Sequence, residues 1–255
     1  MLNLKHIKKS FPGNFEPVLN DINLKLSKGE FCIIIGSNGS GKSTLMRTIL
    51  GDYAVDSGKI EINNQDVTKK DRSRYIACVT QDVSQGTIPE MTLLENMVLS
   101  HMRNKTDRFG FYAKKEKEII AIIKEIGMGL EQYINEPLQK LSGGQKQIIA
   151  TLMAISSKPE ILLLDEHTSA LDPKMQKTLM MYTSKSIMEC GVTAMMVTHK
   201  LDDAVAFGNR LIMLHQGQIV LDVQGNEKKA LDVNTLFTLF HKYEDMTLKS
   251  SGGNV

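Results

Sequence analysis

The sequence predicts an α/β protein built around a mixed, mainly parallel sheet, with a small antiparallel sheet near its N-terminus and an inserted helical segment. Three observations predict this fold. Short, wholly apolar runs at 31–35, 161–164 and 194–197 are typical of strands buried on both faces of a parallel sheet. The segments 2–7 and 22–26 alternate apolar and polar residues, as half-buried antiparallel strands do. From about 83 to 157 the apolar residues recur with helical spacing.

A glycine-rich loop follows the apolar run 31–35. The spacing Gly36-xxxx-Gly41-Lys42-Ser43 is that of a phosphate-binding loop, or P-loop. Its glycines would let backbone N–H groups turn toward phosphate oxygens, Lys42 would supply charge to the β and γ phosphates, and the Ser43 hydroxyl could ligate Mg²⁺. A helix from Thr44, ended by Gly51, would point its positive end at the phosphates. The sequence therefore predicts a P-loop NTPase core that binds a nucleoside triphosphate with magnesium. The loop residues expected to contact the nucleotide are Gly36, Ser37, Asn38, Gly39, Ser40, Gly41, Lys42, Ser43 and Thr44.

The other elements follow in order. Strands are expected at 56–65 and 75–80, the second leading into Gln81. Isoleucines at 119, 120, 122, 123 and 126 predict the buried face of a helix. A helix from Pro173 to Glu189 between two apolar runs is typical of a βαβ unit. The runs 211–214 and 218–221, separated by Gln216-Gly217, predict a hairpin, and a last helix is expected at 233–243 before a disordered tail that starts near Ser250.

Composition excludes some classes of protein. The 255 residues carry 31 Lys and Arg against 29 Asp and Glu, and a net charge of +2 argues against a dedicated nucleic-acid binder. Three scattered cysteines (Cys32, Cys78 and Cys190) in apolar stretches fit reduced core thiols better than a disulfide framework. No apolar run approaches the length of a membrane helix, and the N-terminus lacks the apolar core of a signal peptide. We therefore expect a protein that acts in the cytoplasm.

Two acidic residues, Asp165 and Glu166, end the apolar run 161–164. A carboxylate is tolerated there if it lies at the open end of the strand, where α/β sheets bind their ligands. Asp165 could hold Mg²⁺, and Glu166 could polarise a water for attack on the γ-phosphate.

A second candidate anion site lies at Ser142-Gly143-Gly144. Ser142 stands at the start of a helix that carries Ile148 and Ile149, so it occupies the position of an N-cap with the helix dipole directed outward. One P-loop is sufficient to bind one triphosphate. A second helix end that could bind phosphate therefore indicates either a further ligand or a partner molecule.

The sequence Leu141-Ser142-Gly143-Gly144-Gln145 resembles the signature motif of ABC ATPases. With the P-loop, Gln81, Asp165-Glu166 and His199 in the same order, the resemblance covers nearly the whole chain. It implies the ABC ATPase fold and a head-to-tail dimer of two copies, in which ATP lies between the P-loop of one copy and the signature of the other.

The resemblance also implies roles for individual residues. Glu166, His199 and Gln81 would be catalytic, with His199 contacting the γ-phosphate. Ser43, Gln81 and Asp165 would hold Mg²⁺. The residues that would meet ATP of the other copy or link the two sites are Ser142, Gly143, Gly144, Gln145 and Asp172. Phe11 would stack on adenine, with Phe15 as the alternative.

The chain departs from the family pattern after Glu166, where His167 replaces the usual Pro, and after the signature, where Lys146 and Gln147 stand. It resembles ATP-binding subunits of bacterial importers that are often predicted to carry tryptophan or related aromatic amino acids. The resemblance implies a permease and, indirectly, a substrate-binding protein as partners, with the chain peripheral on the inner face of the membrane. Alternatives are a soluble ABC ATPase and one that drives a mechanical or efflux complex.

The predicted organisation is a single ABC ATPase domain over 1–255. Residues 1–82 and 158–225 would form the nucleotide-binding core with the β subdomain, 83–157 the helical subdomain, and 226–255 a C-terminal helix and tail. In such proteins a groove beside Gln81 receives a short helix of the permease. The apolar stretch 87–98 is a candidate wall of that groove, with Met91 and Met97 as adaptable side chains; each could equally be buried.

Overall fold

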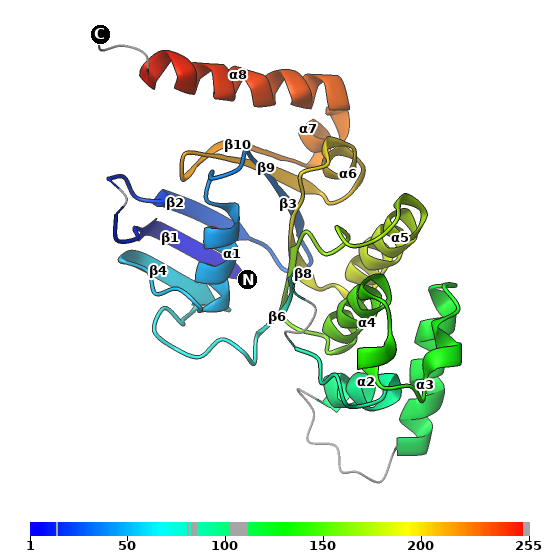
Figure 1. Ribbon diagram of the computed structural model, residues 1–255. Coiled ribbons are helices and arrows are strands. Elements are labelled where there is room, and N and C mark those ends of the chain that lie inside the picture. Colours follow the sequence, from blue (N-terminus) through cyan, green and yellow to red (C-terminus); the bar gives the residue numbers. More distant parts are fainter. Residues whose placement is uncertain (14, 81, 83–85, 103–111, 252–255) are drawn as a thin grey trace. The chain divides into compact units, whose positions relative to one another are not determined.

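The computed structural model divides the chain into two compact units, which are described separately. The first combines Met1–Arg72 with Thr193–Val255, and the second is Ser73–Val192. The structure describes residues 1–13, 15–80, 82, 86–102 and 112–251. Figure 1 labels the helices and strands of both units.

An antiparallel sheet forms the N-terminal part of the first unit. Its strands are β1 (Leu2–Lys9), β2 (Leu19–Leu26), β4 (Ser57–Ile62) and β5 (Gln65–Asp66), in the order β2-β1-β4-β5. The predicted alternation is confirmed, because Leu2, Leu4 and Ile7 of β1 are at most 2% exposed while their neighbours reach solvent. The single strand expected at 56–65 is instead two strands. Asn63 and Asn64 both have positive φ (52° and 63°), as in a tight two-residue hairpin turn.

Parallel strands form the centre of the first unit. The strand β3 (Phe31–Ile35) pairs in parallel with β8 (Thr193–Val197) on one side and with β9 (Arg210–His215) on the other. Every residue of β3 and β8 is buried, which explains why both sequences are wholly apolar or nearly so. The predicted hairpin is confirmed: β10 (Gln218–Gln224) returns antiparallel to β9. The predicted α/β fold class is thus confirmed.

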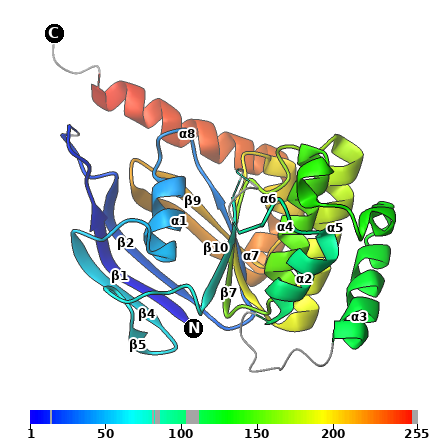
Figure 2. The same cartoon turned by 60° about the horizontal axis from the view of Figure 1, so that its bottom comes forward.

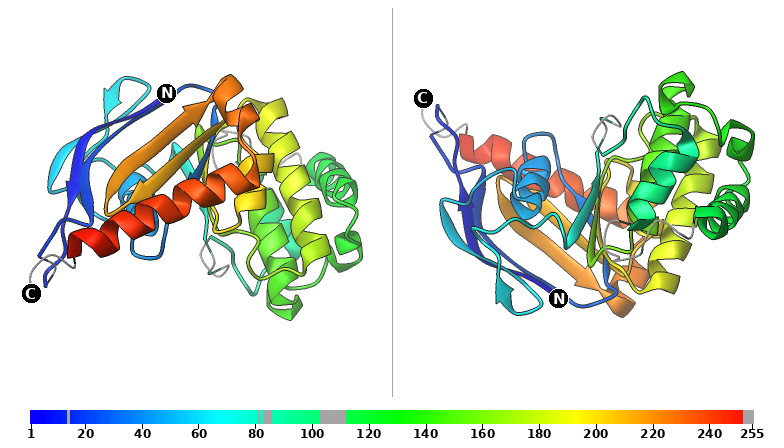
Figure 3. Two further views of the ribbon diagram at one scale, coloured as in Figure 1. Left: turned by 90° about the horizontal axis from the view of Figure 1, so that it is seen from above. Right: turned by 90° about the horizontal axis from the view of Figure 1, so that it is seen from below.

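Four helices complete this unit: α1 (Lys42–Leu50), α6 (Leu201–Ala206), α7 (Gly225–Ala230) and α8 (Val233–Ser251). The helix α8 runs along the β9–β10 hairpin in Figures 1 and 3, and the Tyr243 hydroxyl donates to the Val220 carbonyl at 3.0 Å. The expected end of this helix at 243 is wrong. No glycine or proline interrupts the chain between Tyr243 and Ser251, so the helix continues into the segment expected to be disordered. The last four residues of that segment, 252–255, lie outside the described residues.

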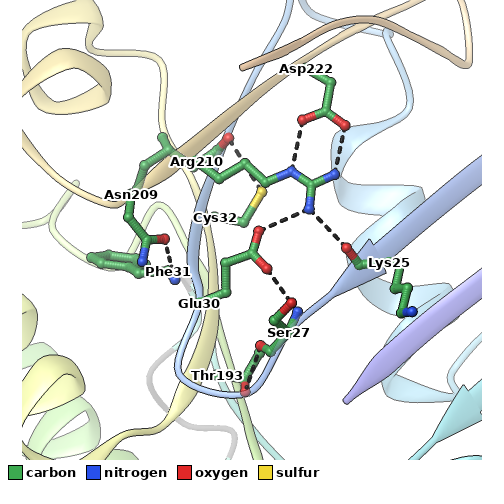
Figure 4. Close-up of polar contacts among 10 residues, drawn as sticks. Lys25, Ser27, Glu30, Phe31, Cys32, Thr193, Asn209, Arg210 and Asp222 are labelled. Atoms are coloured by element: carbon green, nitrogen blue, oxygen red, sulfur yellow. Dashed lines mark hydrogen bonds and ion pairs between the residues drawn. The ribbon is translucent and has the colours of Figure 1, made fainter. Parts of the chain in front are cut away.

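The side chain of Arg210 ties four segments of the first unit together (Figure 4). Its guanidinium donates to both carboxylate oxygens of Asp222 on β10 at 2.7 and 2.6 Å, to Glu30 at 2.8 Å and to the Lys25 carbonyl at 2.8 Å. Only 11% of the Arg210 side chain is exposed, and the hydrogen bonds to Asp222 and Glu30 raise its pKa. The cluster therefore fixes β10, the end of β2 and the turn before β3 around one buried charge.

The second unit consists of a strand pair and helices (Figure 2). Its strands β6 (Ile76–Val79) and β7 (Ile161–Asp165) pair in parallel. Its helices are α2 (Leu93–Met102), α3 (Tyr112–Glu125), α4 (Gly143–Ser156) and α5 (Pro173–Cys190), with 3₁₀ turns η2 (Leu130–Tyr133) and η3 (Leu138–Lys140). The predicted isoleucine stripe is confirmed as core, because Ile119, Ile123 and Ile126 are buried against α2 and α4.

Two sequence-based expectations concern the whole chain. The described ranges contain no helix that is both long enough and apolar enough to cross a membrane. None of the three cysteines, all of them among the described residues, forms a disulfide, but Cys190 is exposed rather than part of a core, because it ends α5 at the surface. The predicted limits of a helical subdomain at 83–157 stay a prediction.

We expect Arg210→Met to lower the free energy of unfolding by about 3 kcal/mol, because it leaves the buried carboxylate of Glu30 without its cation. Urea denaturation followed by circular dichroism measures the change. The matched control is Lys185→Met, which removes a pair with Glu125 in which both side chains are about half exposed, and which we expect to lower the free energy of unfolding far less. Equal losses for the two variants would contradict the structural importance of the Arg210 cluster.

Candidate functional site

The loop after β3 has backbone positions that exclude any side chain. Gly36 has φ of 154°, and a Cβ there would lie 2.3 Å from the Leu214 carbonyl oxygen. At Gly41, with φ of 102°, a Cβ would lie 2.7 Å from the Val18 carbonyl oxygen. Both glycines are therefore required by the close approach of neighbouring backbone.

Lys42 lies across this loop. Its side chain is buried, and Nζ donates to the carbonyl oxygens of Gly36 at 2.8 Å and Ser37 at 2.9 Å. The helix α1 begins here with Gly41 as its N-cap, without a side-chain hydrogen bond to the cap and without an acidic residue in its first turn. The positive end of the helix dipole and the ammonium group of Lys42 thus coincide at one loop.

The remaining loop residues differ in exposure. Asn38, Gly39 and Ser43 are exposed, Ser37 and Thr44 are half-buried, and Ser40 is buried. The Ser40 hydroxyl has no hydrogen-bond partner among the described residues. The loop thus has exposed residues that an anion could reach and a buried residue beneath them, as expected of a loop that wraps an anion.

His199 lies at the same edge of the sheet as this loop. It follows β8, which is the parallel neighbour of β3, and the Thr198 N–H donates to the Ile34 carbonyl at 3.2 Å. The carboxyl ends of neighbouring parallel strands meet at one edge, so the first unit brings His199 and the P-loop together, with the His199 side chain exposed.

In the second unit, Asp165 and Glu166 end the buried strand β7, as the sequence predicts. Both are half-buried. Glu166 has φ of 48°, which is uncommon for a residue with a side chain, and its carbonyl accepts from the Ser169 N–H at 2.9 Å. The neighbouring strand β6 ends opposite, with Val79 paired to Leu164, but Gln81 beyond it lies outside the described residues.

His167 follows Glu166 and is 1% exposed. Burial lowers its pKa to about 4, so the imidazole is neutral at neutral pH. Its Nε2 has no hydrogen-bond partner among the described residues. His167 therefore adds no positive charge beside Asp165 and Glu166 at the end of β7.

The predicted N-cap at Ser142 is confirmed. Its hydroxyl accepts from the Gln145 N–H, and the Gln145 side chain accepts from the Ser142 N–H, which completes a capping box at the start of α4. A Cβ at Gly143 would meet nothing within 4 Å, whereas one at Gly144 would lie 3.0 Å from the Leu171 side chain. The open position is thus Gly143, and Gly144 packs against the segment that leads to Asp172.

Asp172 caps α5 by accepting from the Lys174 and Met175 N–H groups at 3.0 and 3.1 Å. The Asp172 carboxylate therefore stabilises the start of α5 in its own chain, in addition to any contact with a second copy.

Phe11 and Phe15 differ clearly. The Phe11 ring packs edge-on against Tyr53 with ring centroids 5.1 Å apart, whereas Phe15 is fully exposed. Only Phe11 is held in a defined place.

Sequence reasoning missed Gln147. This residue is fully buried on α4, and its Nε2 donates to the Thr80 carbonyl at 3.2 Å, which ties the helix that begins at Ser142 to the end of β6. A signal was present, because Gln147 is a polar residue directly beside the buried stripe of Ile148 and Leu152.

The comparisons with known proteins agree with this geometry. A family model described as "ABC transporter" matches residues 19–169. The tyrosine transport ATP-binding protein of Clostridioides difficile is 38% identical over 247 residues, which cover 94% of this chain and 98% of that protein. The spermidine/putrescine import ATP-binding protein PotA of Haemophilus influenzae is 33% identical over 87% of this chain, which spans 57% of that relative's length.

A solved structure of a dimeric ATP-binding cassette in a post-hydrolysis state, bound to ADP and phosphate, superposes with a TM-score of 0.77. It is 30% identical, and the match covers 88% of this chain and 98% of that one. The ATP-binding subunit of an ABC transporter superposes with a TM-score of 0.78 at 22% identity, over 94% of this chain and 99% of that one.

Proposed function

The chain belongs to the ABC transporter family and hydrolyses ATP, and on this premise we propose that it is the ATPase subunit of a bacterial membrane importer. The names of its relatives support transport of amino acids or polyamines. We propose aromatic amino acids, because the chain matches 98% of the tyrosine transport relative and only 57% of the polyamine one. Selection of the substrate would belong to other subunits.

The single observation that carries the proposal is the loop around Lys42. Two glycines exclude side chains from it, and Nζ lies across its carbonyl groups without a carboxylate in the first turn of α1. We propose that residues 36–44 wrap the phosphates of ATP. Lys42 would exchange the carbonyls of Gly36 and Ser37 for β- and γ-phosphate oxygens.

Mg²⁺ would be held by Ser43 and Asp165. Ser43 offers an exposed hydroxyl in the first turn of α1, and Asp165 offers a carboxylate at the end of β7. This donor set suits Mg²⁺, which takes few protein ligands and leaves the other positions to phosphate oxygens and water. Bound with ATP, the ion would neutralise charge on the β and γ phosphates. Gln81, expected as a further ligand, lies outside the described residues.

Glu166 would act as the general base. Its carboxylate follows a buried strand and can accept the proton of an attacking water, and His167 beside it is neutral at neutral pH. His199, exposed at the edge of the sheet that carries the P-loop, would contact the γ-phosphate. Phe11 would stack on the adenine.

A second copy of the chain would complete the site. The N-terminus of α4 presents Ser142, the open Gly143 and their helix dipole to the outside. We propose that this end meets the γ-phosphate of ATP held by the P-loop of the other copy, with Gly144, Gln145 and Asp172 beside it. The dimeric state of the similar cassette supports a pair of copies, which we propose to be head to tail.

We expect Glu166→Gln to lower ATP turnover at least about a hundredfold, because the amide keeps the shape but cannot accept the proton of the attacking water. ATP would then stay bound, and the variant would shift from monomer to dimer with ATP and Mg²⁺. Phosphate release and size-exclusion chromatography measure the two effects.

The matched control is Glu189→Gln, at an exposed position on α5, which should leave turnover unchanged. A Glu166→Gln chain that hydrolyses ATP at the normal rate, or that stays monomeric at high protein and ATP concentrations, would contradict the assigned base and the dimer.

A permease is the proposed membrane partner, and a groove in the second unit is its proposed docking place. The groove has a volume of about 360 Å³, and its apolar lining includes Ala77, Ile88, Leu99 and Met153. Ile88 and Leu99 are exposed. Met97, which the sequence left open as either a groove residue or a buried one, is fully buried in the core that α2 forms with α3 and α4.

The polar side chains of the groove are bonded within its own wall. The Asn96 side chain accepts from the Ile88 N–H and donates to carbonyls of residues 88, 91 and 92, and the Ser100 hydroxyl donates to the Met153 carbonyl. None of the described residues that line the groove is charged. The groove therefore suits a short, uncharged helix with an apolar side chain at its centre. Docking would hold the chain at the inner face of the membrane.

We expect Leu99→Glu to reduce the fraction of chain that sediments with membranes when it is co-expressed with its neighbouring permease, because it places a charge in an apolar groove. Met188→Glu on α5 is the control, since Met188 is also an exposed apolar side chain but does not line the groove. ATP turnover of both purified variants should be normal. A wild-type chain that stays in the soluble fraction beside every neighbouring permease would indicate a soluble ABC ATPase instead.

A further inference from the structure

The Phe11 ring is one part of a larger aromatic and ionic cluster in the first unit. Its partner Tyr53 meets it at an interplanar angle of 79° with centroids 5.1 Å apart, which is the edge-to-face geometry that aromatic pairs prefer. Tyr53 comes directly after α1, two residues beyond the glycine that ends this helix. The ring contact therefore joins the loop after β1 to the helix that begins at the P-loop.

Tyr53 is held by α1 itself. The Arg47 guanidinium donates to the Tyr53 hydroxyl at 2.9 Å and lies 5.7 Å from the centre of its ring. The backbone carbonyl of Arg47 also accepts from the Tyr53 N–H at 3.4 Å. Backbone and side chain of Tyr53 are thus both bonded to one residue of the helix, so the ring moves with α1.

The other side of the cluster fixes the backbone that carries Phe11. Asp56 accepts from the Ser10 N–H at 2.6 Å and pairs with Lys9 at 3.2 Å. The Lys9 ammonium lies 5.2 Å from the centre of the Phe11 ring, within the range of a cation–π contact. Three contacts therefore hold the segment 9–11 against the segment 53–56. They are the ring contact of Phe11 with Tyr53, the ion pair of Lys9 with Asp56, and the hydrogen bond from the Ser10 N–H to the Asp56 carboxylate.

We propose that Tyr53 is a positioning residue, which holds the Phe11 ring in place as a stacking platform for the base of ATP and couples that platform to α1. The inference rests on the proposed contact of Phe11 with adenine and adds the residue that makes this contact rigid. A platform held before binding costs less ordering when the base arrives. Phe15, whose side chain is fully exposed, has no such support among the described residues.

The inference separates base recognition from phosphate recognition. Tyr53 touches Phe11 and Arg47, whereas the phosphates would contact the loop 36–44. Removal of the Tyr53 ring should weaken ligands that carry a base and spare a ligand that has phosphates only. A residue that merely stabilises α1 would weaken both.

The test measures dissociation constants of ATP and of inorganic tripolyphosphate, each with Mg²⁺, by calorimetry on the full chain. We expect Tyr53→Leu to weaken ATP about fivefold, in line with the strength of an aromatic pair, and to leave tripolyphosphate unchanged. We expect Tyr53→Phe, which keeps the ring, to stay within about twofold of the wild type. Thermal unfolding identifies any variant that is not folded, and in that case Tyr53→Phe and Tyr53→Met provide the comparison.

Phe11→Leu and the double variant Phe11→Leu/Tyr53→Leu complete the cycle. If Tyr53 acts through Phe11, the double variant binds ATP as weakly as Phe11→Leu alone and no weaker. Equal losses for ATP and tripolyphosphate, additive losses in the double variant, or normal ATP binding by Tyr53→Leu would each overturn the inference. A wild-type chain that bound neither ligand would instead contradict the proposed nucleotide site.

Discussion

The contact between the Lys42 ammonium and the carbonyls of Gly36 and Ser37 is the interaction on which the functional part of this structure depends. It closes the turn between β3 and α1 and places a buried cation at the start of a helix. Two things make it possible. The strand β3 is buried along its whole length between β8 and β9, so its end is fixed, and glycines allow neighbouring backbone to approach where any Cβ would collide. A buried cation whose ammonium group lies against carbonyl dipoles is a strong site for an anion.

The rest of the first unit keeps that strand end in place. Arg210, buried at the start of β9, holds Glu30 just before β3 and Asp222 on β10. Arg72 performs a similar function at the far end of α1, where its buried guanidinium donates to the carbonyls of Thr48 and Ile49. Burial lowers the pKa of Arg72, as expected for a cation that is bonded to carbonyls rather than to a carboxylate. The negative end of α1 is thus neutralised within the unit, while its positive end stays available at the P-loop.

Much of this could be predicted from the sequence, because the signals are local. The apolar runs, the glycine spacing and the cap at Ser142 each depend on residues next to one another, and the fold class and the N-cap are confirmed. The errors have a common cause. Cys190 lies on a helix whose orientation toward core or solvent is set by tertiary packing, which also left the burial of Met97 undecided, and α8 is longer than its apolar pattern. Contacts such as Gln147 with Thr80 or Tyr53 with Phe11 join residues 67 or 42 positions apart, and no single sequence reveals such pairs.

The central claim is that the loop around Lys42 binds the phosphates of the ATP that this chain hydrolyses. The most direct measurement is the steady-state ATP turnover of Lys42→Ala beside the wild type, with thermal unfolding to show that both are folded and Lys174→Ala, an exposed lysine on α5, as the control. The account predicts a loss of at least about a hundredfold for Lys42→Ala, because the charge that neutralises the β and γ phosphates is gone, and no loss for the control. A folded Lys42→Ala chain that hydrolysed ATP at the wild-type rate would contradict it.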